Sequence, residues 1–196
     1  MIAGGALSAG LWPIYTSLHG PTSVDQQGEL LGMDTLFWGS MMEGPSGLLI
    51  ALGLAASYTR LTSRAGRTAR VGFALTMVGA LVPALVNLAI LAVMPPLLAP
   101  LFGVGVILIA VANRTGSSLT RFSRRALVGL GMVLIVAFLW ALLVRPDMID
   151  RIDGYRIYGL VANVLFGVGW VLFGASLIVA RGRAAEAGGA LPLPNP

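Results

Sequence analysis

Long apolar runs that end at arginines are the feature that most constrains this chain. Hydropathy over a window of about 20 residues finds such runs at 2–18, 34–58, 71–94, 97–113, 126–144 and 157–180. Runs of this length match the thickness of a bilayer interior when they are helical. The sequence therefore predicts an all-α fold, a polytopic transmembrane bundle of six helices.

The composition agrees with this interpretation. The chain is 57% hydrophobic and only 11% charged, whereas soluble domains carry about 25% charged residues. Nothing remains for a separate soluble domain, so residues 1–183 are predicted to form a single transmembrane domain. The segment 184–196 is rich in small residues and proline, and we expect it to be a disordered cytoplasmic tail.

Two of the six segments have features that weaken the prediction. The first, 2–18, is short and contains Pro13; its alternative is a cleaved signal peptide, but such peptides begin with basic residues and no arginine precedes Arg60. The run 97–113 is also short for about 30 Å of hydrocarbon. We expect it to lie obliquely or to include the Pro95-Pro96 turn in its span.

The arginines predict the orientation. They cluster in alternate loops and after the last apolar run, at Arg60, Arg64, Arg67, Arg70, Arg114, Arg121, Arg124, Arg125, Arg181 and Arg183. Short arginine-rich loops stay in the cytoplasm, so both termini are predicted to be cytoplasmic in a cell membrane. All basic residues are arginine, which fits a GC-rich bacterial genome.

The net charge of +5 does not indicate nucleic acid binding, because the arginines border helices without interleaved aromatic residues. We expect them to attract anionic lipid headgroups instead. The absence of cysteine and lysine, with His19 as the one histidine, argues against thiolate sites, a retinal Schiff base, a P-loop and histidine-held haem or metal. No cofactor or metal is predicted.

Small residues and a faint repeat suggest how the helices pack. Pairs at i and i+4, such as Gly4 with Ser8, Gly5 with Ala9 and Ala6 with Gly10, permit close helix contact, either within the bundle or with a partner subunit. LFGVG occurs at 101–105 and 165–169, and residues 64–72 partly match 121–129. This pattern fits duplication of a helical hairpin, or chance similarity of glycine-rich apolar sequence.

Glu43 is the most unusual residue in the apolar runs. Counted from Asp34 it lies in the outer half of the membrane, two residues before Pro45, which should kink or restart the helix and leave the Met41 carbonyl unpaired. A protonated Glu43 could donate to such an acceptor, and an ionised one needs a cation or hydrogen-bond donors. Because charge in lipid is costly, we expect Glu43 to face the bundle interior or a wet cavity.

Counting depth along the helices places other polar and aromatic groups in the same outer layer. The candidate ligand-binding set is Glu43, Asn87, Asn163, Trp38 and Tyr158, with further aromatics around it at Trp12, Tyr15, Trp140 and Tyr155. The alternative is structural: amides bridge helices, and tryptophan and tyrosine line membrane interfaces.

Two motifs suggest chemistry, and each has a structural alternative. Gly44-Pro45-Ser46-Gly47 resembles the GxSG motif of intramembrane rhomboid proteases, but no histidine lies on a later helix, so Ser46 is expected to bond freed backbone at the kink. Asp147, Asp150 and Asp153 have the spacing of a one-face cation site, yet interleaved arginines favour a salt-bridged turn. No catalytic residue is assigned.

Three functions fit these observations. The first is a small-molecule binding or transport component with an outward-facing polar pocket; its topology resembles that of the substrate-binding subunits of energy-coupling-factor vitamin transporters. The second is an accessory or assembly subunit of a larger membrane complex. The third, which lacks a second positioned acid or base, is a small membrane enzyme acting on a lipid or isoprenoid, with Glu43 as proton donor and Asp34 or Asp147 as its complement.

Overall fold

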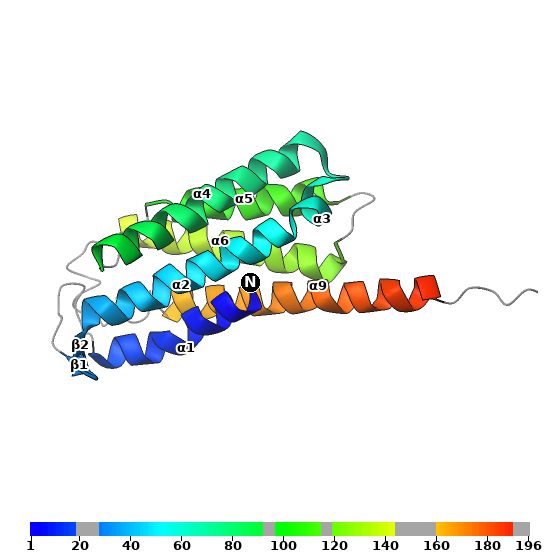
Figure 1. Cartoon of the computed structure of the whole chain (residues 1–196). Helices are drawn as coiled ribbons and strands as arrows, with labels where there is room; N and C mark the ends of the chain where they lie inside the picture. The colour runs from blue at the N-terminus through cyan, green and yellow to red at the C-terminus, as the bar shows by residue number, and fades with distance from the viewer. Residues whose placement is uncertain (19–27, 92–96, 115–118, 144–159, 190–196) are drawn as a thin grey trace, which may run out of the picture.

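The computed structural model describes residues 1–18, 28–91, 97–114, 119–143 and 160–189. In these residues the fold is all-α apart from one hairpin, whose two strands have two residues each. Six long helices dominate the described part of the chain: α1 (Ile2–Leu18), α2 (Thr35–Ala56), α4 (Gly66–Ile90), α5 (Ala99–Ala112), α6 (Arg121–Leu143) and α9 (Phe166–Gly189). They occupy the six apolar runs (Figure 1).

The shorter elements join or extend these helices. The strands β1 (Glu29–Leu30) and β2 (Met33–Asp34) pair antiparallel just before α2. Leu31 and Gly32 between them both have positive φ, as a two-residue hairpin turn requires. The short helix α3 (Tyr58–Thr62) leads towards α4, and the π-helix η1 (Leu160–Leu165) leads directly into α9.

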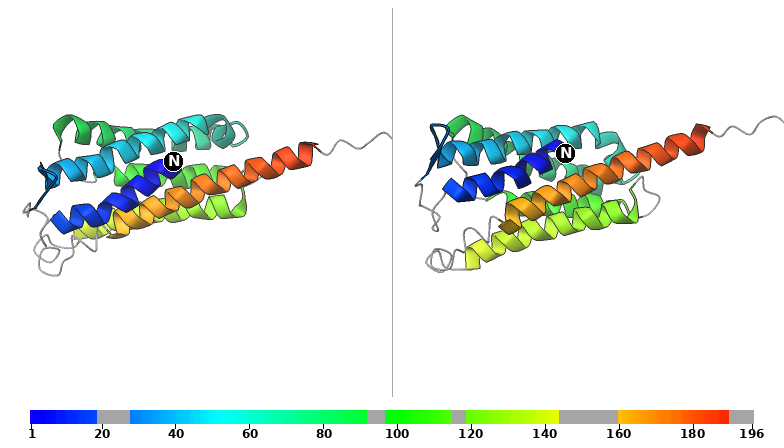
Figure 2. Two further views of the ribbon diagram at one scale, coloured as in Figure 1. Left: turned by 60° about the horizontal axis from the view of Figure 1, so that its bottom comes forward. Right: turned by 90° about the horizontal axis from the view of Figure 1, so that it is seen from below.

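The six long helices form a closed ring. Each packs on the next in chain order, from α1 through α2, α4, α5 and α6 to α9, and α9 packs back on α1. The two views of Figure 2 show α1 beside both α2 and α9. This order lets consecutive helices run in alternate directions, as in other bundles with sequence-neighbour packing.

Small residues allow several of these contacts to be close. A Cβ at Gly72 on α4 would lie 2.7 Å from the carbonyl oxygen of Gly105 on α5, and one at Gly103 on α5 would lie 2.7 Å from that of Gly131 on α6. Gly5 on α1 meets the backbone of Gly167 on α9 in the same way. Van der Waals packing of this kind drives helix association where lipid removes the hydrophobic force.

Large apolar side chains fill the centre of the ring. Phe102 on α5 contacts Phe166 and Trp170 on α9, with ring centroids 5.5 and 5.8 Å apart, and Trp170 contacts Phe173 at 5.8 Å. Trp170 and Phe173 have no exposed surface. The cluster extends to Ile50 and further buried aliphatic residues of α2, α5 and α6.

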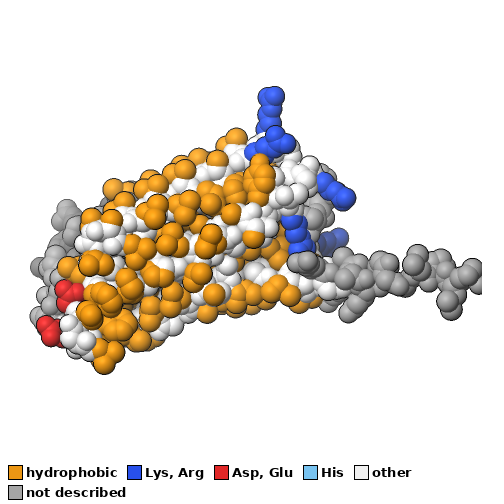
Figure 3. All heavy atoms as spheres, in the orientation of Figure 1, with side chains coloured by type: hydrophobic (Ala, Val, Ile, Leu, Met, Phe, Trp, Pro, Cys, Tyr) orange, Lys and Arg blue, Asp and Glu red, His pale blue; other side chains and the backbone are white. Residues whose placement is uncertain are grey.

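The outer surface of the bundle is also apolar. Large exposed hydrophobic side chains occur on α2, α4, α5, α6 and α9; examples are Leu52, Leu85, Val111, Val136 and Ile178. Figure 3 shows apolar side chains over the flank, arginines at one end and carboxylates at the other. By length and apolar composition, Gly66–Ile90, Arg121–Trp140 and Asn163–Ala180 are candidate membrane spans among the described residues.

The structure refines the expected boundaries. The helix α4 begins at Gly66, before the apolar run at 71, because its first turns carry Arg67 and Arg70. The helix α9 continues to Gly189, beyond the expected start of the tail at residue 184, and residues 190–196 lie outside the described part.

Candidate polar site in the bundle

The helix that carries Glu43 runs without interruption from Thr35 to Ala56, although Pro45 lies inside it. Asp34 caps its first turn by accepting a 2.8 Å hydrogen bond from the backbone N–H of Phe37. The hydroxyl of Ser46 donates to the carbonyls of Met42 and Glu43. Ser46 therefore bonds backbone carbonyls beside the proline, but these are not the carbonyl of Met41 that Pro45 leaves without its helical donor, so the expectation that Ser46 bonds the freed acceptor was wrong in its partner.

Glu43 and Asn87, which the sequence placed in one layer, do meet. The side-chain amide nitrogen Nδ2 of Asn87 on α4 donates to Oε2 of Glu43 on α2 over 2.7 Å. Asn87 has no exposed surface, whereas Glu43 is half-buried. This distance lies at the short end of the ordinary range for an N–H···O hydrogen bond.

The packing between α2 and α4 explains why these two side chains come so close. A Cβ at Gly47 would lie 2.8 Å from the Cβ of Ala84, and one at Gly44 would lie 2.5 Å from Leu88. Small residues next to Glu43 therefore bring the helix backbones together one turn from Asn87. The side chains of Glu43 and Asn87 can then bond directly across the interface.

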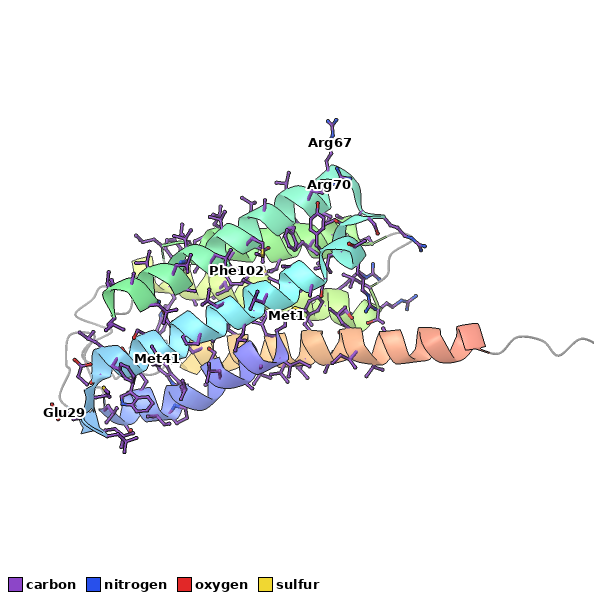
Figure 4. The ribbon with its side chains drawn as sticks, in the orientation of Figure 1. Met1, Glu29, Met41, Arg67, Arg70 and Phe102 are labelled. Carbon is purple, nitrogen blue, oxygen red and sulfur yellow. The ribbon has the colours of Figure 1, made fainter. Side chains whose placement is uncertain are left out.

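Glu43 has no counter-charge in the described part of the chain. Its one hydrogen bond through a side-chain atom is that from Asn87, and the other carboxyl oxygen, Oε1, has no described partner. Arg67 and Arg70 lie at the opposite end of the bundle from Glu29 (Figure 4), and Asp34, which caps α2, belongs to the Glu29 end. The carboxyl group of Glu43 thus sits among apolar helices with an amide as its described partner.

Asn163 is not joined to this pair by any contact of its described side chain. It lies on η1, where its main-chain oxygen accepts a 3.4 Å hydrogen bond from the hydroxyl of Ser8 on α1. A π-helical turn often marks a functional position, since it alters which side chains share a face. The structure thus joins Glu43 and Asn87, and Asn163 contributes backbone to the α1–η1 contact.

The aromatic residues separate into two groups. Trp12 and Tyr15 on α1 are buried with Met42, next to Glu43, and pack on Leu11 and Val164. Trp12 and Tyr15 have ring centroids 5.4 Å apart. Their positions at i and i+3 place them on the face of α1 that Ser8 shares, a periodicity that the sequence could have revealed.

Trp38 belongs to the hairpin end of α2. Its indole N–H donates to the carbonyl of Leu30 over 3.2 Å, and its ring contacts Phe37 edge-on. This bond anchors β1 to the first turn of α2. Tyr158, the remaining predicted ligand-binding residue, lies outside the described residues, as do Tyr155 and the run Asp147, Asp150 and Asp153.

The arrangement offers limited chemistry beyond ligand or proton binding. Within the described residues no group of three metal-ligating side chains occurs. Asp34, the proposed complement of Glu43 in an enzyme, is used as the helix cap. The geometry at Glu43 can hold a proton, or can accept hydrogen bonds from a ligand.

No protein-family model, curated protein or solved structure matches this chain, so the site stands on its own geometry.

Proposed function

We propose that the chain is a multi-pass membrane protein in which all six long helices cross the bilayer. Three of them meet the length and hydropathy of a full span, and α2 is 22 residues long. The ring closes only with α1 and α5, which have 17 and 14 residues. Helices of this length are accommodated by local thinning of the bilayer or by flanking turns.

The charge distribution supports an orientation. Arginines occupy one end of the bundle and Glu29 the other, as Figures 3 and 4 illustrate, and Asp34 pairs with Glu29 in the hairpin. By the positive-inside rule the arginine end faces the cytoplasm, with both termini on that side, in the cell membrane of a bacterium. Glu43 then lies towards the extracytoplasmic side.

Within this topology the protein is a small-molecule binding or transport component. The observation that supports this function is the Glu43 carboxyl, which has an amide partner and no described cation. An ionisable group in a membrane interior is costly, and the groups that occur there usually bind a ligand, an ion or a proton. The complementary ligand is a mostly apolar molecule with a cationic or hydrogen-bond-donating group, because such a group would pair with the unbonded oxygen.

Metabolite extraction tests this function directly. The protein is purified in mild detergent as wild type, as Glu43→Gln and as Asp34→Asn, and each sample is extracted and examined by mass spectrometry. A small molecule present in wild type and Asp34→Asn but lost in Glu43→Gln supports the proposal. A molecule retained equally by all three, or recovered from none of them, contradicts it.

A second candidate, an accessory subunit of a larger membrane complex, rests on the outer face of α1. This helix exposes small residues, Ala3, Ala6 and Gly10, together with Pro13, where the other long helices expose large apolar side chains. Of the three predicted small-residue pairs, Gly4/Ser8 and Gly5/Ala9 face the bundle, and Ala6/Gly10 faces outward. A smooth outward face suits a partner helix.

Native gel electrophoresis of gently solubilised membranes separates the two candidates. Co-migration with a large assembly that is abolished by Gly10→Leu, but not by Leu52→Phe on the exposed face of α2, would favour the accessory role. Migration as an isolated chain in all cases would exclude that role.

A further inference from the structure

The helix pairs α4–α5 and α6–α9, which carry the matching sequence segments, are packed differently. The matched phenylalanines of the two LFGVG copies, Phe102 and Phe166, contact each other edge-on at the centre of the bundle. In the first pair Gly72 meets the backbone of Gly105. In the second, Gly129, which matches Gly72, has no neighbour within 4 Å, and Leu130 lies against Gly169 instead. A leucine thus separates α6 from α9 where glycines bring α4 and α5 together.

A groove lies between α6 and α9 towards the arginine end of the bundle. Its volume is about 590 Å³, and its walls include Phe122, Leu172, Ala175 and Val179, with the hydroxyl residues Thr120 and Ser176. Pockets of about 300–1,000 Å³ hold small molecules. Phe122, Leu172 and Val179 are each about half exposed, at 54%, 46% and 54%, so the groove opens to the outer surface that the bilayer would cover.

Two arginines lie close along the chain to Thr120 and Phe122, which line one end of this groove. Arg121 and Arg125 are exposed in the first turns of α6, next to Thr120 and Phe122. The Thr120 hydroxyl accepts from the backbone N–H of Ser123, so it caps this helix, and the positive end of the helix dipole adds to the arginine charge. Arg124 is turned elsewhere and donates to the carbonyl of Arg114 over 2.9 Å.

We propose that the α6–α9 groove is a binding site for an anionic glycerophospholipid of the surrounding bilayer. One acyl chain lies in the groove against Phe122, Leu172 and Val179, and the phosphate group lies at Arg121 and Arg125. The apolar walls of the groove match the acyl chain, and its cationic end matches the phosphate group. In a bilayer the acyl chain likewise lies deeper than the phosphate group. This inference rests on the proposed bilayer placement of the helices and is independent of the ligand at Glu43.

Native mass spectrometry with defined lipids tests the site. The protein is released from detergent micelles that contain equal amounts of phosphatidylglycerol and phosphatidylcholine with identical acyl chains. Wild type is expected to retain one phosphatidylglycerol preferentially. Arg121→Gln should reduce that retention roughly fivefold, whereas Arg64→Gln, the matched position before α4, should not change it.

Ala175→Phe fills the groove and should abolish retention, whereas Ile178→Phe, on the exposed face of the same helix, should not.

Three retention results would overturn the proposal: equal retention of both lipids by wild type, unchanged retention of phosphatidylglycerol in Arg121→Gln, or loss of phosphatidylglycerol with Arg121→Gln but not with Ala175→Phe. A chain that dimerises through this groove would also overturn it, since a helix would then be the occupant. A chain that is soluble without detergent would refute the bilayer placement instead, so the two failures are distinguishable.

Fluorescence quenching covers the case in which Ala175→Phe does not fold. Phe122→Trp places an indole in the groove, and Val136→Trp places one on the exposed face of α6. After the quenching of the wild-type chain, which has four native tryptophans, is subtracted, brominated phosphatidylglycerol should quench position 122 more strongly than brominated phosphatidylcholine, and both should quench position 136 equally. No difference between the lipids at position 122 contradicts the proposal.

Discussion

Asn87 on α4 donates its side-chain amide to Oε2 of Glu43 on α2 over 2.7 Å, between two helices that glycine and alanine bring into close contact. The bond has a fully buried donor and a half-buried acceptor, with no described cation beside the carboxyl. The hydrogen bond therefore bridges two helices and leaves the other carboxyl oxygen, Oε1, without a described partner.

Asn87→Ala should lower the unfolding free energy by about 1 kcal/mol, as expected for an interhelical hydrogen bond in lipid. The Glu43→Gln variant should keep stability within about 0.5 kcal/mol of wild type, because its amide oxygen still accepts from Asn87. Unfolding in mixed micelles with increasing denaturing detergent measures both. If Glu43→Gln were as destabilising as Asn87→Ala, the negative charge itself would be engaged by another group.

Gly103→Val should destabilise the bundle by about 1–3 kcal/mol, the usual cost of overpacking. A Cβ at this position would lie 2.7 Å from the backbone oxygen of Gly131, which cannot move without shifting α6. Gly129→Val on α6 is the matched control, since nothing lies within 4 Å of its added Cβ. Thermal unfolding in detergent should separate the two, and equal effects would contradict the close α5–α6 crossing.

Ser46→Ala should reduce stability by about 1 kcal/mol through the loss of a hydroxyl that bonds two carbonyls near Pro45. A fluorophosphonate probe, which labels activated serine nucleophiles, should leave Ser46 unmodified in wild-type protein. Labelling at Ser46, followed by mass spectrometry of the peptide, would revive the protease interpretation of the GxSG motif.

The orientation can be tested in intact cells because the chain contains no cysteine. Single-cysteine variants Glu29→Cys and Arg67→Cys lie at opposite ends of the bundle. A membrane-impermeant maleimide should label position 29 in intact cells and position 67 only after permeabilisation. The reverse pattern would invert the proposed topology, and labelling of both in intact cells would exclude it.

The sequence predicted the helical elements well because apolar length is a strong signal in lipid. It located the ends less accurately: hydropathy follows the part of a helix that is apolar, so the charged first turns of α4, with Arg67 and Arg70, were left out. The hairpin at Glu29–Asp34 was not predicted, because two-residue strands leave no periodicity.

From the sequence, only the depth of the site residues along their helices could be predicted. Counting residues from a helix end gives height along the bundle, and Glu43 and Asn87, which this count placed in one layer, share a hydrogen bond. Contact also depends on which face of each helix points inward. That rotation is set by packing at Gly44 and Gly47, and for Asn163 by the π-helical turn, neither of which depth counting includes.

We infer that Glu43 is a sheltered carboxyl that can exchange a proton or bind a ligand. The hydrophobic reagent N,N′-dicyclohexylcarbodiimide modifies protonated carboxyls in apolar surroundings, and peptide mass spectrometry locates the product. We expect modification at Glu43, its loss in Glu43→Gln, and none at the exposed Glu29 and Asp34. An unmodified Glu43, or equal modification of all three carboxyls, would contradict it.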